Sequence, residues 1–468
     1  MTASQTQGRR GGRSRRDFIK LSGAAALALS SSSAAAPRAA GKNRPNVLVI
    51  ITDQHHADAL SCVGNKYIQT PALDSLAAVG VNFRLSYTNN PVCSPARSAL
   101  LTGRTSCETG VYVNGRPIHK DIPNMGQWLS AKGGYEAVYA GKWHIPATYS
   151  TSIPGFRVLH TGIGGQGNVC DPAVAMACEA FIRGRKSDRP FLMVASFMQP
   201  HDICEWLRLN VDVPKRPRFP VPADWVPPLP ANHAFPKVEP ANLKSIRARN
   251  EPGKGKWTAD HWRYYRWSYY RHVEQVDGLI GLVLQALRDT GADKNTLVVF
   301  TSDHGEGMGH HQMVRKSSPY DEASRVPLIV SIPGRAREGR VDTRHPVSGV
   351  DVMPTVCDYV GIAAPPEMRG RSLRKLLQRD VDESDGFTVT EISGDTGRML
   401  RTRKYKYVTY RGDPGKQLFD MEADPGELKN LAADEAYADV VAKHRKLLLD
   451  WEDRLTVAPN VPEKPGLW

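Results

Sequence analysis

The most regular feature of the chain is a set of short, unbroken apolar runs that end abruptly at polar residues. Runs of this kind, without alternation, are typical of strands that are buried on both faces. We expect such strands at residues 46–52, 136–140, 191–197 and 296–302, and a further buried strand at residues 325–330. Strands buried on both faces belong to a mostly parallel sheet with helices on each side.

Helical periodicity is clearest after Ala259, and Gly291 is placed to stop this helix. Its apolar positions recur at steps of three and four residues: Tyr269, Val273, Val276, Ile280, Val283 and Leu287. A shorter helix is expected to open at Thr70 and Pro71 and to close at Gly80. Residues 205–256, rich in proline and basic residues, show no periodicity, so we interpret them as a loop that shapes the substrate site.

The pattern changes at about residue 371. Residues 386–390 and 404–410 alternate between apolar and polar, as half-buried antiparallel strands do, and a helix is predicted at about residues 436–454. The fold class predicted is therefore α/β, with a large, mostly parallel central sheet flanked by helices. A smaller C-terminal α+β subdomain would carry an antiparallel sheet. We expect the catalytic domain at residues 42–370 and the subdomain at residues 371–468.

Polar residues follow four of the predicted strands at their carboxyl ends. They are Asp53 and Gln54, Lys142 and His144, His201 and Asp202, and Asp303 and His304. In open, mostly parallel sheets, ligands bind outside the carboxyl ends of the strands. The four strands therefore predict one common site, with oxygen ligands suited to a hard divalent cation.

A reactive side chain is expected just before a helix that begins at Pro95 and ends at Gly103. Ser94 suits the N-cap, Pro95 the first helical position and Gly103 a left-handed C-terminal position. Cys93 would then lie just outside the helix, where unpaired N–H groups favour an anion, and Arg97 would add a fixed positive charge. This arrangement indicates a nucleophile that processes anions, although a small residue before an ordinary capped helix would give the same local pattern.

Cys93-Ser94-Pro95-Ala96-Arg97, followed by Leu101-Thr102-Gly103-Arg104, resembles the signature of the type I sulfatases in the alkaline-phosphatase-like superfamily. The resemblance implies that Cys93 is oxidised to formylglycine by a formylglycine-generating maturation enzyme. It further implies that the hydrated aldehyde attacks a sulfate ester and forms a covalent sulfo-enzyme intermediate.

The same resemblance implies roles for the residues of the predicted site. One divalent cation, Ca²⁺ by family expectation although Mg²⁺ would also fit, would be bound by Asp53, Gln54, Asp303, His304 and the modified Cys93. The residues expected to neutralise the sulfate are Arg97, Lys142 and Lys316. His144 matches the position that takes a proton from the sulfated gem-diol, and His201, together with Lys316, the position that protonates the leaving oxygen.

Charge and the N-terminus indicate where the protein acts. The formal net charge is +14, of which +8 lies beyond residues 1–41, and such a moderately basic surface suits a polyanionic substrate; the chain contains no nucleic-acid-binding module. Residues 14–20, Ser-Arg-Arg-Asp-Phe-Ile-Lys, form a twin-arginine pattern, and the weakly apolar stretch after it is too short to span a membrane stably. We interpret residues 1–41 as a signal peptide that is removed, so the protein would use the twin-arginine export machinery and be periplasmic or secreted.

Seven cysteines are present and no Cys-x-x-Cys pair occurs, which disfavours a thiolate zinc site, and a chain this long does not require disulfides. The sequence thus predicts an exported sulfatase, with a sulfated carbohydrate as the expected substrate. Two alternatives remain. One is a phosphonate monoester or phosphodiester hydrolase of the same superfamily, which can share the Asp53-Gln54 pair. The other is a non-catalytic glycan-binding protein whose Cys93 is never matured.

Overall fold

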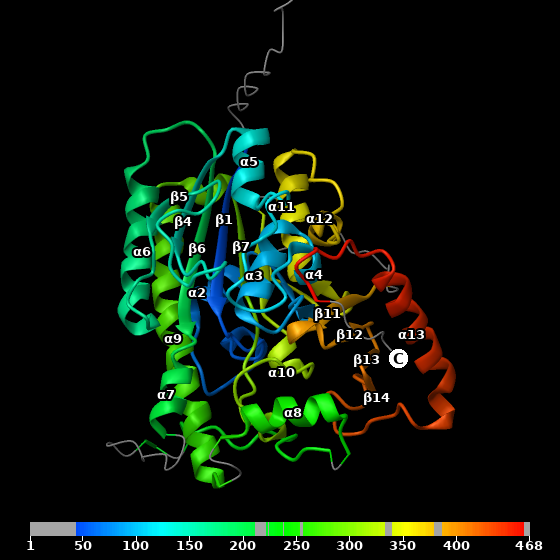
Figure 1. Ribbon diagram of the computed structural model, residues 1–468. Helices are drawn as coiled ribbons and strands as arrows, with labels where there is room; N and C mark the ends of the chain where they lie inside the picture. The colour runs from blue at the N-terminus through cyan, green and yellow to red at the C-terminus, as the bar shows by residue number, and fades with distance from the viewer. Residues whose placement is uncertain are drawn as a thin grey trace, which may run out of the picture. The chain divides into compact units, whose positions relative to one another are not determined.

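The computed structural model describes residues 44–210, 221–222, 224–236, 238–252, 256–332, 339–378 and 386–462 (Figure 1). All of them belong to one unit, residues 39–468. The expected signal peptide lies outside the described residues. The expected division at residues 370 and 371 stays a prediction.

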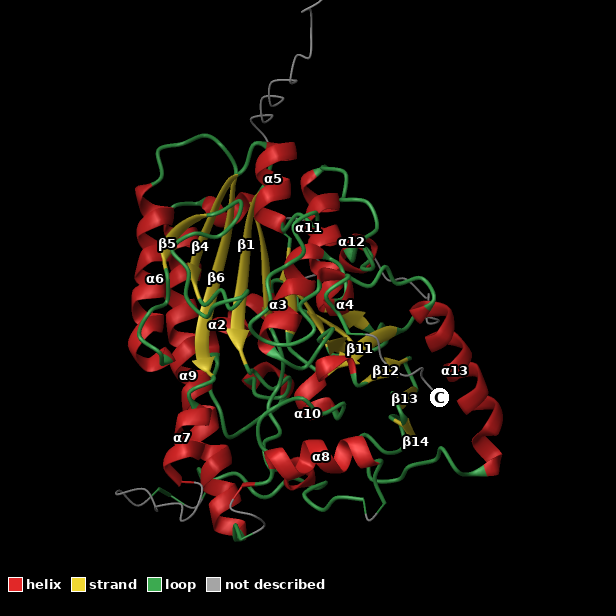
Figure 2. Ribbon diagram, in the orientation of Figure 1, coloured by secondary structure: helices red, strands yellow, loops and turns green. Residues whose placement is uncertain are grey.

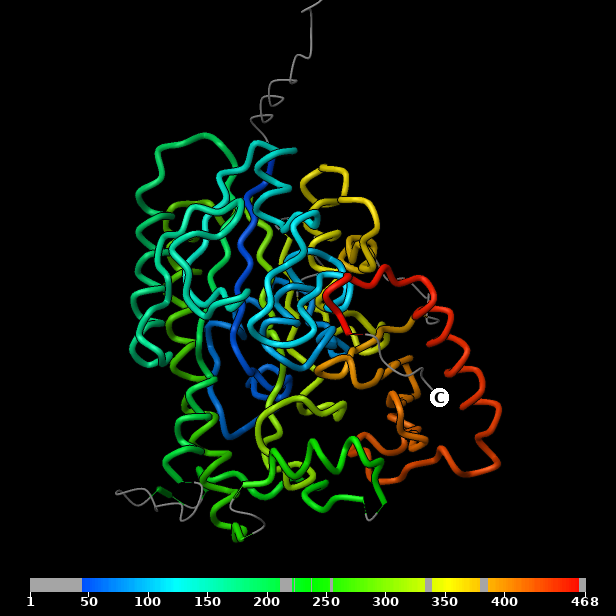
Figure 3. Tube along the Cα trace, in the orientation of Figure 1, coloured from blue at the N-terminus to red at the C-terminus, as the bar shows by residue number. Residues whose placement is uncertain are grey.

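The described chain is built around an eight-stranded sheet. Its order is β5 (Arg157–His160), β4 (Glu136–Gly141), β6 (Phe191–Pro200), β1 (Asn46–Asp53), β7 (Thr296–Ser302), β8 (Leu328–Ser331), β2 (Val81–Phe83) and β9 (Arg340–Asp342). The five strands from β5 to β7 run parallel, whereas β8 is antiparallel to both of its neighbours. In Figure 3 the blue trace of β1 runs between later segments of the chain. The predicted mostly parallel sheet is confirmed.

Side chains of β1 enter two separate hydrophobic cores, one on each face of the sheet. Val47, Val49 and Ile51 pack with apolar side chains of α3 (Cys93–Thr102), α5 (Met125–Gly133) and α11 (Val352–Val360). Leu48 and Ile50 pack with those of α2 (Pro71–Ala78), α6 (Gly167–Gly184) and α9 (Ala259–Asp289). Figure 2 shows α6 and α9 along one side of the sheet. The unbroken apolar run of β1 therefore has the physical cause that the sequence predicted.

A second sheet lies in the C-terminal part of the chain and is antiparallel throughout. Its strands are β11 (Thr388–Ile392), β12 (Gly397–Arg401), β13 (Tyr405–Tyr410) and β14 (Asp413–Asp420). One face packs against α13 (Ala438–Glu452) through Val441 and Leu448, and the other against α8 (Ala241–Asn250) through Leu243 and Ile246. The predicted antiparallel strands and the final helix are confirmed.

Two predictions about local structure are wrong in part. Residues 205–256 are not an irregular loop throughout, since they include most of α7 (Ile203–Asn210) and all of α8. Only a few apolar residues of α8 are buried, among basic residues, so its helical pattern is weak. The strand expected at residues 325–330 begins only at Leu328, because Pro327 has no N–H for a sheet hydrogen bond.

The remaining elements are short, and the two strands among them pair in a separate parallel sheet. The strands and α-helices are β3 (Ser86–Tyr87), α4 (Ser106–Thr109), α10 (Asp321–Ser324), β10 (Val347–Ser348) and α12 (Arg374–Gln378). The 3-10 turns are η1 (Ser61–Val63), η3 (Ala292–Asn295), η4 (His310–Gln312), η5 (Gly349–Asp351), η6 (Ser393–Asp395) and η7 (Glu435–Tyr437). Among the described helices, none combines the length and apolar character needed to cross a membrane. All seven cysteines are free thiols.

The end of β4 offers a test of how closely it packs on β6. Gly141 has a φ of +101°, and a Cβ atom there would lie 1.8 Å from the carbonyl oxygen of Ser196. We expect Gly141→Ala to lower the free energy of unfolding by about 2 kcal/mol or more, because the backbone must shift and adopt a strained conformation. Urea denaturation followed by circular dichroism measures this loss.

Gly278→Ala is the matched control. Gly278 lies inside α9, and a Cβ atom there would meet nothing within 4 Å. We expect this substitution to raise the free energy of unfolding by about 0.5–1 kcal/mol, since alanine favours helix. Equal urea midpoints for Gly141→Ala and the unsubstituted protein would contradict the close approach of the two strands.

Candidate active site

The carboxyl ends of four parallel strands deliver polar side chains to one region. Asp53 is the last residue of β1, and Asp303 follows β7 directly. Lys142 follows β4, and His201 follows β6. The pairing of β1 with β6 and β7, and of β4 with β6, brings these ends together. The predicted convergence is confirmed for Asp53, Lys142, Asp303 and His304, whose contacts follow.

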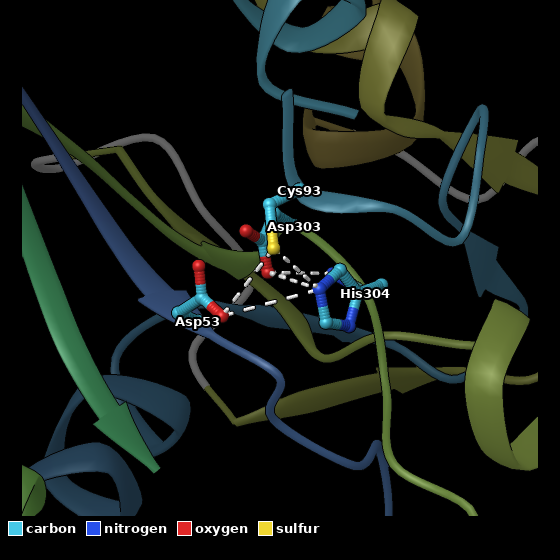
Figure 4. Close-up of side chains that lie close together, drawn as sticks. All are labelled: Asp53, Cys93, Asp303 and His304. Atoms are coloured by element: carbon cyan, nitrogen blue, oxygen red, sulfur yellow. Dashed lines mark hydrogen bonds and ion pairs between the residues drawn. The ribbon is translucent and has the colours of Figure 1, made fainter. Parts of the chain in front are cut away.

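Asp53, Cys93, Asp303 and His304 form a compact cluster (Figure 4). One ligand atom from each lies within 4.8 Å of the others, and all four residues are buried. The Cys93 Sγ is 3.2 Å from His304 Nε2 and 3.8 Å from Asp53 Oδ1. His304 Nε2 lies 3.6 Å from Asp303 Oδ1. Residues far apart in the sequence thus surround one point.

Cys93 occupies a helix start, although not in the way the sequence predicted. The N-cap of α3 is Val92 and not Ser94, so Cys93 is the first helical residue. The Ser94 backbone N–H is bound by the Asn114 side chain, 3.0 Å away, and the Ser94 hydroxyl donates to the His144 carbonyl. A distant side chain therefore replaces the local cap. Gly103 ends the helix in the left-handed conformation, as predicted.

Two lysines bring positive charge to the thiol. Lys316 Nζ lies 2.8 Å from Cys93 Sγ and 3.1 Å from His304 Nε2, and Lys142 Nζ lies 2.7 Å from Asp53 Oδ2. Burial and the charge of Asp53 would raise the pKa of the Cys93 thiol, but Lys142, Lys316 and His304 outweigh them and lower it well below its usual value. The position of residue 93 is therefore one that stabilises negative charge.

Arg97 lies fully buried behind the cluster. In the described residues its guanidinium donates hydrogen bonds to two carboxylates, a carbonyl and a hydroxyl. Its Nε is 2.9 Å from Asp303 Oδ2, and its Nη2 is 3.0 Å from Asp53 Oδ2. The remaining bonds go to the Lys142 carbonyl and the Ser196 hydroxyl, at 2.8 and 2.7 Å. Arg97 thus holds both carboxylates in place. Its expected contact with sulfate stays a prediction.

The two predicted acid–base histidines differ in their surroundings. His144 has a φ of +60°, and its buried Nδ1 has no hydrogen-bond partner among the described residues. Burial, together with the charge of Lys142, lowers the pKa of His201 to about 3. The proton-transfer roles of both residues stay predictions.

Gln54 is held from several sides, and the sequence did not reveal one of its partners. Its backbone has a φ of +71°, its N–H donates to Asp303 Oδ1 at 3.0 Å, and its side-chain Oε1 faces Lys316 Nζ at 3.3 Å. Its Nε2 donates to Glu306 at 2.5 Å. The sequence analysis missed Glu306. Its place three residues after Asp303, in the same strand-end segment, was a signal that could have indicated it.

The donor set of the cluster fits a divalent cation. Asp53 and Asp303 are both buried, and burial and the charge of Asp53 raise the pKa of Asp303. A cation among these carboxylates would relieve their repulsion and hold both of them ionised. The Lys316 ammonium lies within hydrogen-bond distance of Gln54 Oε1, Cys93 Sγ and His304 Nε2.

A second group of possible ligands, His311, Glu322 and Glu427, lies apart from this cluster. The Asn232 amide nitrogen lies among them, 3.3 Å from His311 Nε2, 3.0 Å from Glu322 Oε1 and 3.1 Å from the Gly426 carbonyl oxygen. Since an amide donor already occupies this position, these residues form a hydrogen-bonded core.

Comparison with known proteins identifies the family. The sulfatase family model matches residues 45–362, and the model of the C-terminal region of N-sulphoglucosamine sulphohydrolase matches residues 309–454. The chain is 32% identical to the Delta 4,5-hexuronate-2-O-sulfatase of Bacteroides thetaiotaomicron, over 89% of this chain and 90% of that protein.

Solved structures give the same result. A 2-O GAG sulfatase superposes with a TM-score of 0.78 and 28% identity, over 91% of this chain and 97% of that one. The phosphonate monoester hydrolase of Agrobacterium radiobacter superposes with a TM-score of 0.70 and 26% identity, over 88% and 96% of the two chains. With the family model matching more than half of its length, the chain belongs to the sulfatase family and is a sulfuric ester hydrolase.

Proposed function

We propose that this sulfatase removes sulfate from a sulfated carbohydrate, with hydrated formylglycine at position 93 as the nucleophile. The observation that carries the proposal is the position of the Cys93 Sγ. It lies within 4 Å of Lys142 Nζ, Lys316 Nζ, His304 Nε2 and Asp53 Oδ1. An oxygen nucleophile at this place would have both a cation site and positive charge for the sulfuryl oxygens beside it.

The carbohydrate substrate is supported by the relatives and by charge. Two of the similar proteins are named as a hexuronate 2-O-sulfatase and a 2-O GAG sulfatase. Of the formal net charge of +14, +8 remains without the seven basic residues and one acidic residue of residues 1–41, and this positive charge suits a polyanionic glycan. The similarity to a phosphonate monoester hydrolase, together with the Asp53-Gln54 pair, supports a second candidate activity on phosphonate monoesters or phosphodiesters.

The cation that we propose is Ca²⁺, and Mg²⁺ also suits oxygen ligands. Its ligands would be Asp53, Gln54, Asp303, His304 and the modified residue 93. When bound, the cation supplies positive charge that stabilises the sulfuryl oxygens as negative charge develops on them. Arg97 would keep Asp53 and Asp303 aligned toward it, through the contacts described above.

The protein residues would move the protons. One hydroxyl of the hydrated aldehyde would lose its proton to water and attack sulfur while the bond from sulfur to the alcohol oxygen breaks, and His201 with Lys316 would donate a proton to that oxygen. His144 would then take the proton of the second hydroxyl. The carbon–oxygen bond to the sulfate breaks, the aldehyde returns, sulfate leaves and water hydrates the aldehyde again. Lys142 and Lys316 would neutralise the sulfate throughout.

Maturation and export belong to the same proposal. A formylglycine-generating enzyme would oxidise Cys93 in the cytoplasm, and the twin-arginine machinery would then carry the folded protein to the periplasm or the exterior. The support is the twin-arginine pattern at residues 14–20. This route suits an enzyme whose nucleophile must be made before it leaves the cell.

Cys93→Ser tests the nucleophile. We expect the rate of multiple turnover on 4-nitrophenyl sulfate to fall by about a thousandfold or more, because a serine hydroxyl cannot provide the second hydroxyl that expels sulfate. Mass spectrometry of the matured protein should show that the peptide with residue 93 is lighter than the cysteine form by about 18 Da. Cys62→Ser, at the exposed thiol, is the matched control and should keep full activity. An unaltered rate in Cys93→Ser would sink the mechanism.

Chelation tests the cation. Treatment with EDTA should abolish activity and lower the melting temperature, and CaCl₂ should restore both. At a concentration of one hundred times Kd, the cation should stabilise the fold by about 2.7 kcal/mol. Asp53→Asn should remove this calcium-dependent shift, whereas Asp293→Asn, at an exposed position, should keep it. Full activity in EDTA would contradict a required cation.

Matched substrates separate the two candidate activities. We expect a higher kcat/KM for 4-nitrophenyl sulfate than for 4-nitrophenyl phosphate or a phenylphosphonate monoester of the same alcohol. Ion chromatography should detect sulfate released from a 2-O-sulfated uronic acid disaccharide. Preference for the phosphonate ester would instead establish the second candidate, and no sulfate release from any sulfated disaccharide would contradict a carbohydrate substrate.

A further inference from the structure

The Gln54 side chain can present either of two different ends to the cation site. Its oxygen can bind a cation, whereas its NH₂ group can only donate hydrogen bonds and would repel one. The two ends have nearly the same shape, so the contacts of the amide decide which one faces the cluster. An aspartate or glutamate would not raise this question, because both of its carboxylate oxygens are acceptors.

Glu306 provides the contact that decides the orientation. It is fully buried, and no ion pair with a lysine or arginine is recorded for it among the described residues. Its two carboxylate oxygens accept hydrogen bonds from different partners. Oε1 accepts from the Tyr265 hydroxyl and from the Arg315 backbone N–H, and Oε2 accepts from Gln54 Nε2 at 2.5 Å. All three of these contacts are accepted by Glu306, so its carboxylate acts as an acceptor and takes the NH₂ end of Gln54 on its side.

The opposite end of the amide then faces the site. Gln54 Oε1 lies 3.3 Å from Lys316 Nζ, which itself contacts Cys93 and His304. The oxygen therefore points at the same region as the other proposed cation ligands. The Gln54 backbone is held as well, since Tyr269 donates to its carbonyl at 2.7 Å. With the backbone anchored, rotation of the amide is the remaining freedom.

We infer that Glu306 is a positioning residue for the cation site: it binds the amide nitrogen of Gln54 and so directs the amide oxygen to the cation. A neutral amide ligand at position 54 therefore needs a hydrogen-bond acceptor beside its nitrogen, and Glu306 is that acceptor. The inference rests on the proposed cation site. It adds a residue that touches neither substrate nor cation and acts only through Gln54.

Glu306→Gln isolates this role because it changes one atom at the contact. The new oxygen can keep both bonds of Oε1, to Tyr265 and Arg315, while an NH₂ group takes the place of Oε2. Two NH₂ groups would then meet, and Gln54 would turn its oxygen to residue 306 and its NH₂ to the cation site. We expect the affinity for CaCl₂, measured by isothermal titration calorimetry after EDTA treatment and dialysis, to fall about 10- to 100-fold.

A double variant that exchanges the residue types at positions 54 and 306 should restore cation binding. In the double variant Gln54→Glu with Glu306→Gln, the NH₂ of residue 306 donates to the carboxylate of residue 54, and net charge is unchanged. We expect the double variant to bind CaCl₂ at least as tightly as the unsubstituted protein. Gln54→Glu alone places two carboxylates in contact and should lower the melting temperature. Because the exchange retains the hydrogen bond between residues 54 and 306 and those from Tyr265 and Arg315, it tests the inference even if a single variant folds poorly.

Glu391→Gln is the matched control. Glu391 is also fully buried, and its carboxylate accepts from the Ser106 N–H, the Ser106 hydroxyl and the Cys107 N–H, away from Gln54. We expect this substitution to lower the melting temperature without changing CaCl₂ affinity. Unchanged affinity in Glu306→Gln, or a double variant no tighter than the weaker single variant, would overturn the inference while the cation site stands. Failure of the unsubstituted protein to bind CaCl₂ would overturn both.

Discussion

The active site depends on the pairing of the Asp53 carboxylate at the end of the central strand. Asp53 is fully buried, and a buried charge is costly unless other charges and hydrogen bonds compensate it. Arg97 and Lys142 contact the same carboxylate, and together with His201 and Lys316 they hold its pKa well below the usual value despite burial. The ion pairs among these charged side chains offset the free-energy cost of burying them. Each charge therefore depends on the others being in place.

This constraint explains how the sheet and the site are joined. Arg97 comes from α3, Lys142 from the end of β4 and Asp53 from the end of β1, so each ion pair also links two elements of the fold. Moving any of these elements would leave a charge unpaired in the interior. In the proposed function, an incoming sulfate adds negative charge and a divalent cation offsets it, so each would favour binding of the other.

Gln54, a neutral side chain among the proposed ligands, would require a different kind of support. A carboxylate ligand is oriented by attraction to the cation, whereas an amide must be oriented by its neighbours. Glu306 is in the right place to do this, since it is fixed by Tyr265 of α9 and by the backbone of Arg315. The same segment carries Lys316, so the loop after β7 would position both a cation ligand and a charge for the sulfate.

Much of the fold could be predicted from the sequence, because its signals are local. Apolar runs marked the central strands, alternation marked the antiparallel strands, and three- and four-residue steps marked α9. Predictions were wrong where tertiary contacts replaced local ones. Ser94 resembles an N-cap, but Asn114 binds its backbone N–H, and α8 is stabilised mainly by packing against the second sheet.

The sequence by itself determined the strands, the residues at their ends and the family signature around Cys93. Each of these features depends on residues that are close together in the sequence, so it can be found without the folded structure. Only the tertiary structure decided that Arg97 lies behind the two carboxylates and that Glu306 faces the Gln54 amide. Hydrogen bonds and ion pairs between distant residues leave no periodic pattern, because they depend on how strands and helices are arranged in space.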